Sequence, residues 1–249
     1  MTADQSIATD EDTPVSGTIV ATDVDGDTLS YSVSTPPANG TLTLDGSTGQ
    51  YTYTPGANFN GNDRFIVTVS DGNGGTTTST VSIGVRPVND APVTADQSIA
   101  TDEDTPVSGT IVATDVDGDT LSYTVGTPPA NGTLTLNGAT GAYTYTPGAN
   151  FNGNDRFVVT VSDGNGGTTT STVSIGVRPV NDAPVTADQS IATDEDTPVS
   201  GTIVATDVDG DTLSYSVSTP PANGTLTLDG TTGQYTYTPG ANFNGNDRF

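Results

Sequence analysis

Apolar and polar residues alternate in short runs along the whole chain. Leu29, Tyr31 and Val33 occupy every second position of one run, and Tyr51 and Tyr53 do so in another. The same alternation recurs at Leu42 and Leu44, at Phe65, Val67 and Val69, and at Val81, Ile83 and Val85. A period of two in segments rich in Thr, Val, Ile and Tyr is typical of half-buried β-strands. Since no segment has a helical period, the chain is predicted to be all-β.

The alternating pattern is itself repeated. The sequence that starts at Thr2 starts again at Thr94 and at Thr186, a period of 92 residues. Each junction carries the sequence Arg-Pro-Val-Asn-Asp-Ala-Pro-Val, at residues 86–93 and 178–185. A period of this size corresponds to a small domain rather than to one turn of a solenoid. The predicted domains are 1–92, 93–184 and 185–249, and the third is a truncated copy.

Turn-forming residues divide each copy into strands. In the first copy they include Asp25-Gly26, Asp45-Gly46 and Pro55-Gly56. The strands are predicted at residues 4–9, 17–22, 28–34, 40–44, 50–54, 64–70 and 76–86. Seven strands at this spacing predict a Greek-key β-sandwich of the immunoglobulin type. The alternation places Tyr51 and Tyr53 in its core, which we favour over a sugar-binding platform.

The acidic residues follow the loops at the two ends of this predicted sandwich. If successive strands run up and down, Glu11 lies at the same end as the last strand. Asp23, Asp25 and Asp71 then lie at the opposite end. The C-terminal end of one domain faces the N-terminal end of the next across the linker. Carboxylates of two domains are therefore expected to meet at every junction, where they repel one another unless cations are present.

Composition narrows the classes of function. The chain has 30 acidic residues, five arginines and no lysine, with a net charge of −25. This charge excludes nucleic acid and anionic membrane as expected partners. Because His, Cys and Lys are absent, the usual acid–base and nucleophilic groups are missing, and an enzyme is not expected. No disulfide can form, and no apolar run is long enough to predict insertion into a membrane.

Oxygen ligands without His or Cys favour a hard cation, Ca²⁺ or Mg²⁺. A roomy cage made of loops from two domains favours Ca²⁺. Residues 23–27 begin like an EF-hand loop, but Thr28 and Ser34 stand where that loop needs Gly and Glu. The only three glutamates are Glu11, Glu103 and Glu195, one per copy at one place. This placement is typical of a bidentate ligand that reaches across a gap.

Taken in order, four motifs resemble a cadherin repeat. They are Glu11, Ala-Thr-Asp-Val-Asp at 21–25, Val-Ser-Asp-Gly at 69–72 and Val-Asn-Asp-Ala-Pro at 88–92. The nearest likeness is to the cadherin-like tandem repeats of large bacterial calcium-dependent surface adhesins, and it covers the whole chain. The linker departs from the cadherin pattern, because Pro87 stands in place of its first Asp. The Leu-Asp-Arg-Glu motif is also absent, so fewer ions per junction are expected than cadherins hold.

The resemblance implies a set of calcium ligands at each junction. At the first junction they are Glu11, Asn89, Asp90, Asp115, Asp117 and Asp163. At the second they are Glu103, Asn181, Asp182, Asp207 and Asp209. The acidic loops add Asp23, Asp25 and Asp71 in the first copy. Three further positions stay open: Asp12 and Asp27 are ligands, supporting groups or merely exposed, and Asp63 either pairs with Arg64 or contacts metal.

These observations together predict a structural extender region of a secreted or cell-surface adhesin, bacterial in type. Calcium at the junctions would stiffen it, and it would support cell adhesion or a biofilm. Its partners would be Ca²⁺, neighbouring repeats and a surface or matrix ligand bound elsewhere in the parent protein. The alternative is a β-sandwich module that itself binds a glycan or a protein, although the lack of Trp weighs against sugar stacking.

Overall fold

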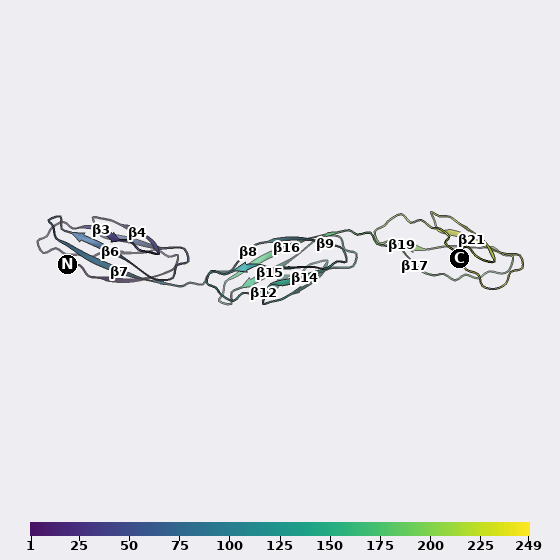
Figure 1. Ribbon diagram of the computed structural model, residues 1–249, viewed down its shortest axis with the longest axis horizontal. Helices are drawn as coiled ribbons and strands as arrows, with labels where there is room; N and C mark the ends of the chain where they lie inside the picture. The colour runs from purple at the N-terminus through teal and green to yellow at the C-terminus, as the bar shows by residue number, and fades with distance from the viewer.

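The protein consists of three β-sandwich units joined end to end in an elongated row (Figure 1). A computed structural model describes all residues, 1–249. Unit 1 contains β1 to β7, unit 2 contains β8 to β16, and unit 3 contains β17 to β21. The predicted all-β tandem sandwich is confirmed. The structure contains no helix with the length and apolarity that crossing a membrane requires.

Unit 1 has two sheets of four and three strands. Its strands are β1 (Gln5–Asp10), β2 (Val15–Thr18), β3 (Ser30–Thr35), β4 (Gly40–Leu44), β5 (Gln50–Pro55), β6 (Gly61–Ser70) and β7 (Thr76–Arg86). The larger sheet has the order β1-β7-β6-β3, and the smaller has the order β2-β5-β4. β1 pairs with β7 in parallel, whereas the other pairs are antiparallel. The strands therefore alternate in direction, as the placement of the acidic loops assumed.

Unit 2 repeats this arrangement. Its strands are β8 (Val93–Thr94), β9 (Gln97–Asp102), β10 (Val107–Thr110), β11 (Ala113–Thr114), β12 (Ser122–Thr127), β13 (Gly132–Leu136), β14 (Ala142–Pro147), β15 (Gly153–Ser162) and β16 (Thr168–Arg178). The larger sheet is β12-β15-β16-β9 and the smaller is β10-β14-β13. β8 and β11 form a short extra pair at the N-terminal end, which holds the end of the linker against the unit.

The prediction of one strand at 17–22 is wrong. β2 covers Val15–Thr18 and pairs with β5, but the chain then leaves that sheet. The backbone N–H of Ile19 donates to the carbonyl of Gly49 at 2.9 Å, and Ala21 forms an isolated bridge with Thr2. Residues 17–22 keep a strand-like alternation because Ile19 is buried. However, their hydrogen bonds go to two different parts of the unit.

The core lies between the two sheets and is built from the alternating residues. Tyr53, Phe65 and Val67 are fully buried, and Tyr51 is 3% exposed. The rings of Tyr51 and Phe65 meet edge to face with centroids 5.0 Å apart, a favoured aromatic geometry. The prediction that both tyrosines belong to the core is confirmed. Neither ring is free to stack on a sugar.

Asp63 lies inside unit 1 and holds the loop between β3 and β4. Its carboxylate accepts hydrogen bonds from the backbone N–H groups of Ala38 (3.0 Å), Asn39 (2.8 Å) and Arg64 (2.8 Å), and from the hydroxyl of Tyr53 (3.0 Å). Asp63 was expected either to pair with Arg64 or to contact a metal. The structure shows neither an ion pair with Arg64 nor a place in an acidic group, and its carboxylate instead holds the loop. Burial opposes ionisation, but these hydrogen bonds prevail and hold the pKa of Asp63 below its usual value.

Unit 3 shows that the strands depend on their partners. It contains β17 (Val185–Thr186), β18 (Val199–Thr202), β19 (Ala205–Thr206), β20 (Gly224–Leu228) and β21 (Gln234–Pro239). Residues 245–249 match the start of β6 in sequence but form no strand, and residues 185–249 hold no counterpart of β7. Residues 189–194 and 214–219, which match β1 and β3 in sequence, form no strand here. Because β7 and β6 supply all their ladder hydrogen bonds in unit 1, identical sequences lose their structure without them.

Replacing the buried carboxylate by an amide tests its role. Asp63→Asn places an N–H₂ group among backbone donors, so we expect unit 1 to lose about 1–3 kcal/mol of stability at pH 7. The folded-state pKa of Asp63 is lowered, so its contribution is present above the unfolded pKa, about 3.9. That contribution is lost as the pH falls through the folded value. Thermal unfolding by circular dichroism at pH 7 and pH 3 measures both effects. The difference between variant and parent should shrink at pH 3, and an equal difference at both would contradict this account.

The matched control is Asp45→Asn at an exposed turn. Unit 2 carries Asn137 at that position, whose side-chain oxygen accepts from the N–H groups of Ala139 (3.0 Å) and Thr140 (3.2 Å). In unit 1 the Ser47 hydroxyl and nearby N–H groups lower the pKa of Asp45 to about 2. Since the amide keeps the backbone hydrogen bonds, we expect only a small change at pH 7.

Amide hydrogen exchange tests the dependence of strands on partners. We expect residues 213–217 of unit 3 to exchange much faster than residues 29–33 and 121–125, which match them in sequence. The β20–β21 pair, which is hydrogen-bonded in the structure, should stay protected. Equal protection of residues 213–217 and their two counterparts would show that the strand forms without β6.

Candidate metal centres

Glu11 is fixed at the start of the linker by hydrogen bonds to backbone groups. β1 ends at Asp10, and Asp12 adopts a left-handed conformation (φ 56°) that turns the chain. The N–H of Glu11 donates to the carbonyl of Arg86 at 2.9 Å, and the N–H of Val88 donates to Glu11 Oε1. Glu11 is only 4% exposed. Its second oxygen, Oε2, accepts a hydrogen bond from the side chain of Asn60 at 3.4 Å.

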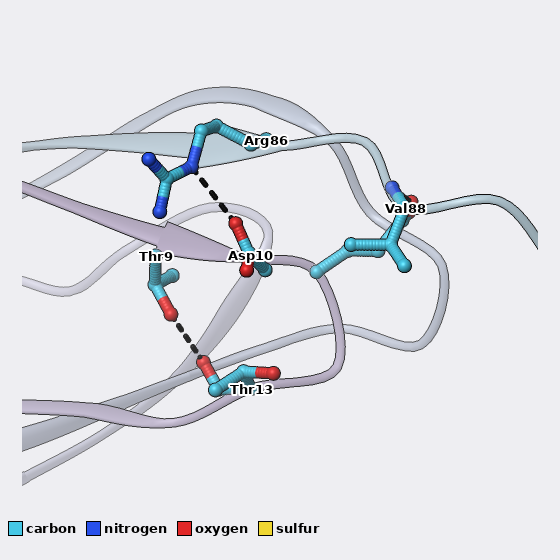
Figure 2. A network of polar contacts seen from close by, with 6 residues as sticks. Thr9, Asp10, Thr13, Arg86 and Val88 are labelled. Atoms are coloured by element: carbon cyan, nitrogen blue, oxygen red, sulfur yellow. Dashed lines mark hydrogen bonds and ion pairs between the residues drawn. The ribbon is translucent and has the colours of Figure 1, made fainter.

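An ion pair lies beside the hydrogen bonds that fix Glu11. Arg86 Nε donates to Asp10 Oδ1 at 2.8 Å, and the Thr9 hydroxyl donates to the Thr13 carbonyl at 2.7 Å (Figure 2). Arg178 and Asp102 form the same pair in unit 2, at 3.0 Å. Both partners are largely exposed, so the pair contributes little to stability. It does place one positive charge beside the acidic end of units 1 and 2.

The first junction brings three carboxylates from three segments together. Glu11 comes from the end of β1, Asp90 from the linker, and Asp117 from the loop after β11 in unit 2. One oxygen of each lies within 4.8 Å of the others. The N–H of Asp90 donates to Asp117 Oδ2 at 2.8 Å, which ties the linker to unit 2. Glu103, Asp182 and Asp209 form the same group at the second junction, where the corresponding distance is 2.7 Å.

A second group lies within the N-terminal end of unit 2. Asp115, Asp119 and Asp163 each offer an oxygen within 4.8 Å of the others. The side chain of Asn89 donates to Asp163 Oδ2 at 2.8 Å, so the linker of the preceding junction reaches this group too. Asp163 is 4% exposed. In unit 1 the matching residues Asp23, Asp27 and Asp71 also converge, and in unit 3 Asp207, Asp209 and Asp211 do so.

The loop aspartates divide their two oxygens between two tasks. Oδ1 of Asp163 accepts hydrogen bonds from the N–H groups of Asn165 (2.7 Å), Gly166 (3.1 Å) and Gly167 (3.0 Å). Oδ1 of Asp115 accepts from the N–H groups of Asp117 (3.0 Å) and Asp119 (3.4 Å). These contacts are Asx-type turns that fix the loop. Oδ2 of Asp115 has no hydrogen-bond partner, and Oδ2 of Asp163 accepts from the side chain of Asn89, so neither Oδ2 holds its own loop.

Three carboxylate oxygens at the junctions are buried and have no hydrogen-bond partner. They are Asp90 Oδ2 and Asp182 Oδ2 in the linkers and Asp115 Oδ2 in a loop of unit 2. A buried polar atom without a partner is costly, and more so when it carries charge. A bound cation would satisfy them. The donor set consists of carboxylate and amide oxygens only, which fits Ca²⁺ or Mg²⁺ and not a softer metal.

The electrostatics of the junction follow from this crowding. Burial raises the pKa of Asp90, and the nearby charges of Asp117, Asp12, Glu11 and Asp115 raise it further. Burial and the charge of Asp209, with those of Asp104, Glu103 and Asp207, raise the pKa of Asp182 in the same way. In contrast, the hydrogen bond from Asn89 lowers the pKa of Asp163, helped by backbone N–H groups. At each junction the linker aspartate therefore has a raised pKa, caused by burial and by the carboxylates around it.

The structure separates the predicted residues into those that converge and those that do not. Glu11, Asp90 and Asp117 share one group and Asp115 and Asp163 another, with Asn89 between them. At the second junction, Asn181 donates to the Asp182 carbonyl (2.8 Å), and no aspartate matching Asp163 is present in residues 185–249. Asp25 joins no group.

Two sets of residues were not predicted as ligands but lie at the groups. Asp27, which was left open, belongs to one of them, and so does Asp119, the residue of unit 2 that matches it and that the sequence analysis did not single out. Asn60 and Asn165, which sequence reasoning missed, each donate to a carboxylate there. Their only signal in the sequence was a position in the turns that flank β6 and β15.

Titration of the aspartates without metal tests this account of the charges. In chelator, ¹³C NMR should show Asp90 and Asp182 protonating above the usual pH range of aspartate, and Asp163 and Asp23 below it. The hydrogen bonds from the N–H groups of Asp27 and Asp25 lower the pKa of Asp23, which makes it the matched control in unit 1. An Asp90 that protonated no higher than Asp23 would show that the carboxylates do not meet as described.

Comparisons with known proteins identify the family and the fold of the chain. A family model for the bacterial Ig domain matches residues 1–84, 89–176 and 181–249. The EC21-23 segment of human CDH23 aligns with 16% identity over 95% of this chain and 88% of that one, with a TM-score of 0.58. The EC22-24 segment of mouse Cadherin-23 aligns with 19% identity over 95% of this chain and 86% of that one, with a TM-score of 0.55.

At such identities the likeness shows the fold alone, and it confirms the resemblance to cadherin-like tandem repeats. A search of curated proteins gave no match. The chain therefore belongs to the bacterial Ig domain family, as a tandem array of that domain with the fold of cadherin repeats.

Proposed function

We propose that this chain is an extender region of an extracellular bacterial adhesin, stiffened by Ca²⁺ at its junctions. One observation carries the proposal: carboxylates from both units and the linker converge at each junction, with buried oxygens that have no partner. Tandem Ig-like and cadherin-like repeats suggest an adhesion-type extender in any case, and such domains are typically structural rather than catalytic. The proposed domains are 1–92, 93–184 and 185–249. Their role would be to project a binding tip from a cell or into a biofilm.

The charges supply the mechanism. Glu11 belongs to unit 1, Asp90 to the linker and Asp117 to unit 2, so one ion bound among them would tie three segments together. An ion in the second group would bind Asp115 and Asp163 and draw in Asn89 from the linker. Without cations the same residues repel one another. Binding would therefore replace a repulsive, flexible joint by a rigid one.

The site residues of this proposal are those of the two junctions. The first junction uses Glu11, Asn89, Asp90, Asp115, Asp117 and Asp163. The second uses Glu103, Asn181, Asp182, Asp207 and Asp209, without an aspartate matching Asp163. We therefore propose that the second junction binds Ca²⁺ more weakly than the first. Asp23 and Asp71 of unit 1 form a group with Asp27 that is separate from these two junctions.

A calcium titration of the full chain tests the proposal. Calorimetry should detect binding with dissociation constants on the order of 10⁻⁴–10⁻³ M, as for extracellular calcium modules. Binding should raise the melting temperature by mass action, and small-angle scattering should show a longer maximum dimension in Ca²⁺ than in chelator. The proposal fails if calorimetry finds no binding, or if the dimension is the same in both conditions.

Two variants check which residues serve which junction. Glu103→Ala should weaken binding at the second junction alone, and Asp117→Ala at the first alone, because these residues lie at opposite ends of unit 2. Chemical shifts of the linker residues 87–92 and 179–184 report on the two junctions separately. Asp45→Asn, far from both, is the control and should change neither. Equal loss at both junctions from either variant would contradict the assignment.

A further inference from the structure

An asparagine amide accompanies the acidic groups at both ends of the units. Asn60 Nδ2 donates to Glu11 Oε2, and Asn152 Nδ2 donates to Glu103 Oε2, each at 3.4 Å. At the other end, Asn165 Nδ2 donates to Asp119 Oδ2 at 2.8 Å, and Asn73 Nδ2 donates to Asp27 Oδ2 at 2.9 Å. In every case the N–H₂ group meets a carboxylate oxygen of a group that the structure brings together. The recurrence in units 1 and 2 makes this a feature of the fold.

The backbone sets the position of Asn60 without help from an ion. The turn before it is held by hydrogen bonds from the N–H of Phe59 to the Gly56 carbonyl (3.1 Å) and from the N–H of Asn58 to Asp12 Oδ1 (3.1 Å). Asn58 and Gly61 adopt positive φ angles of 56° and 125°. Asn60 therefore stays beside Glu11, and only its side chain is free to turn.

The side-chain chemistry of asparagine suits both states of such a site. A primary amide carries two N–H donors on one side and a carbonyl acceptor on the other. The donor side stabilises a carboxylate that has no cation. A half turn about the last side-chain bond instead presents the oxygen, which is a normal ligand for Ca²⁺. A neutral ligand also raises the number of ligating oxygens without adding to the repulsion between the carboxylates.

We propose that Asn60, Asn152 and Asn165 are further Ca²⁺ ligands that exchange a donated hydrogen bond for an oxygen contact when the ion binds. This inference rests on the proposed function, because it concerns the same sites. Asn60 lies between β5 and β6, whereas the nearby Asp63, inside β6, is occupied in holding the loop between β3 and β4. Asn60 and Asn152 serve the groups of Glu11 and Glu103, and Asn165 serves the group of Asp119.

Unit 3 supplies a matched control. Asn244 follows the same turn as Asn60, but Glu195, the residue that matches Glu11, is exposed. No hydrogen bond joins the two side chains, in contrast to Asn60 with Glu11 and Asn152 with Glu103. Asn244→Ala should therefore leave calcium binding unchanged, whereas Asn60→Ala and Asn152→Ala should each weaken one junction.

The test is a calcium titration of the full chain with its variants. We expect Asn60→Ala to weaken the first junction about tenfold and to leave the second unchanged. Asn60→Asp adds a negative charge, so it should lower the melting temperature in chelator. In the presence of Ca²⁺, the same substitution should tighten binding of the ion. A side chain with only a structural role would lower the melting temperature equally with and without Ca²⁺, and that result would overturn the inference.

A measurement on the unmodified chain avoids variants that fail to fold. The side-chain carbonyl ¹³C resonances of Asn60, Asn152 and Asn165 should shift on adding Ca²⁺, and that of Asn244 should not. If the parent chain binds no Ca²⁺ at all, the proposed function itself fails. If it binds Ca²⁺ while these three resonances stay fixed, the function stands and the asparagine inference is wrong.

Discussion

Repulsion between carboxylates that the backbone holds close together is the constraint on which the arrangement of the units depends. Glu11 is fixed by the N–H of Val88, and Asp90 by its own hydrogen bond to Asp117, so neither can move away without giving up these contacts. The strands of units 1 and 2 are nearly identical and apolar inside, and they place Glu11 and Glu103 at the same position in the two junctions. The sandwich is thus a support that carries acidic residues to its two ends.

The parallel pair β1–β7 links the core to the junction. It brings the end of β1, and with it Glu11, to the point where β7 becomes the linker. Where β7 has no counterpart, in residues 185–249, the segment that matches β1 forms no strand, and Glu195 is exposed. The buried position of Glu11 is therefore a result of tertiary pairing. The same local sequence does not produce it alone.

Alternation and repetition were enough to predict the fold class, the period and the end of the unit at which each acidic loop lies. They failed where hydrogen bonds, rather than the periodicity of the sequence, determine where a strand ends or what a side chain contacts. Residues 17–22 alternate like one strand, yet Ile19 bonds to Gly49 and Ala21 to Thr2. Asp63 reads as a surface residue because Arg64 follows it. Only the structure shows that its partners are Tyr53 and the loop at Ala38 and Asn39.

The hydrogen bonds that Oδ1 of the loop aspartates accepts from the backbone have a consequence for the mechanics of the array. Because Oδ1 of Asp115 and of Asp163 already accepts hydrogen bonds from the loop backbone, ion binding would not require these loops to refold. Under the proposed function, each joint then responds to calcium separately, without refolding its neighbours. A long array of such units would have a fixed contour length and a variable persistence length. The calcium concentration outside the cell would set the bending stiffness of the array joint by joint.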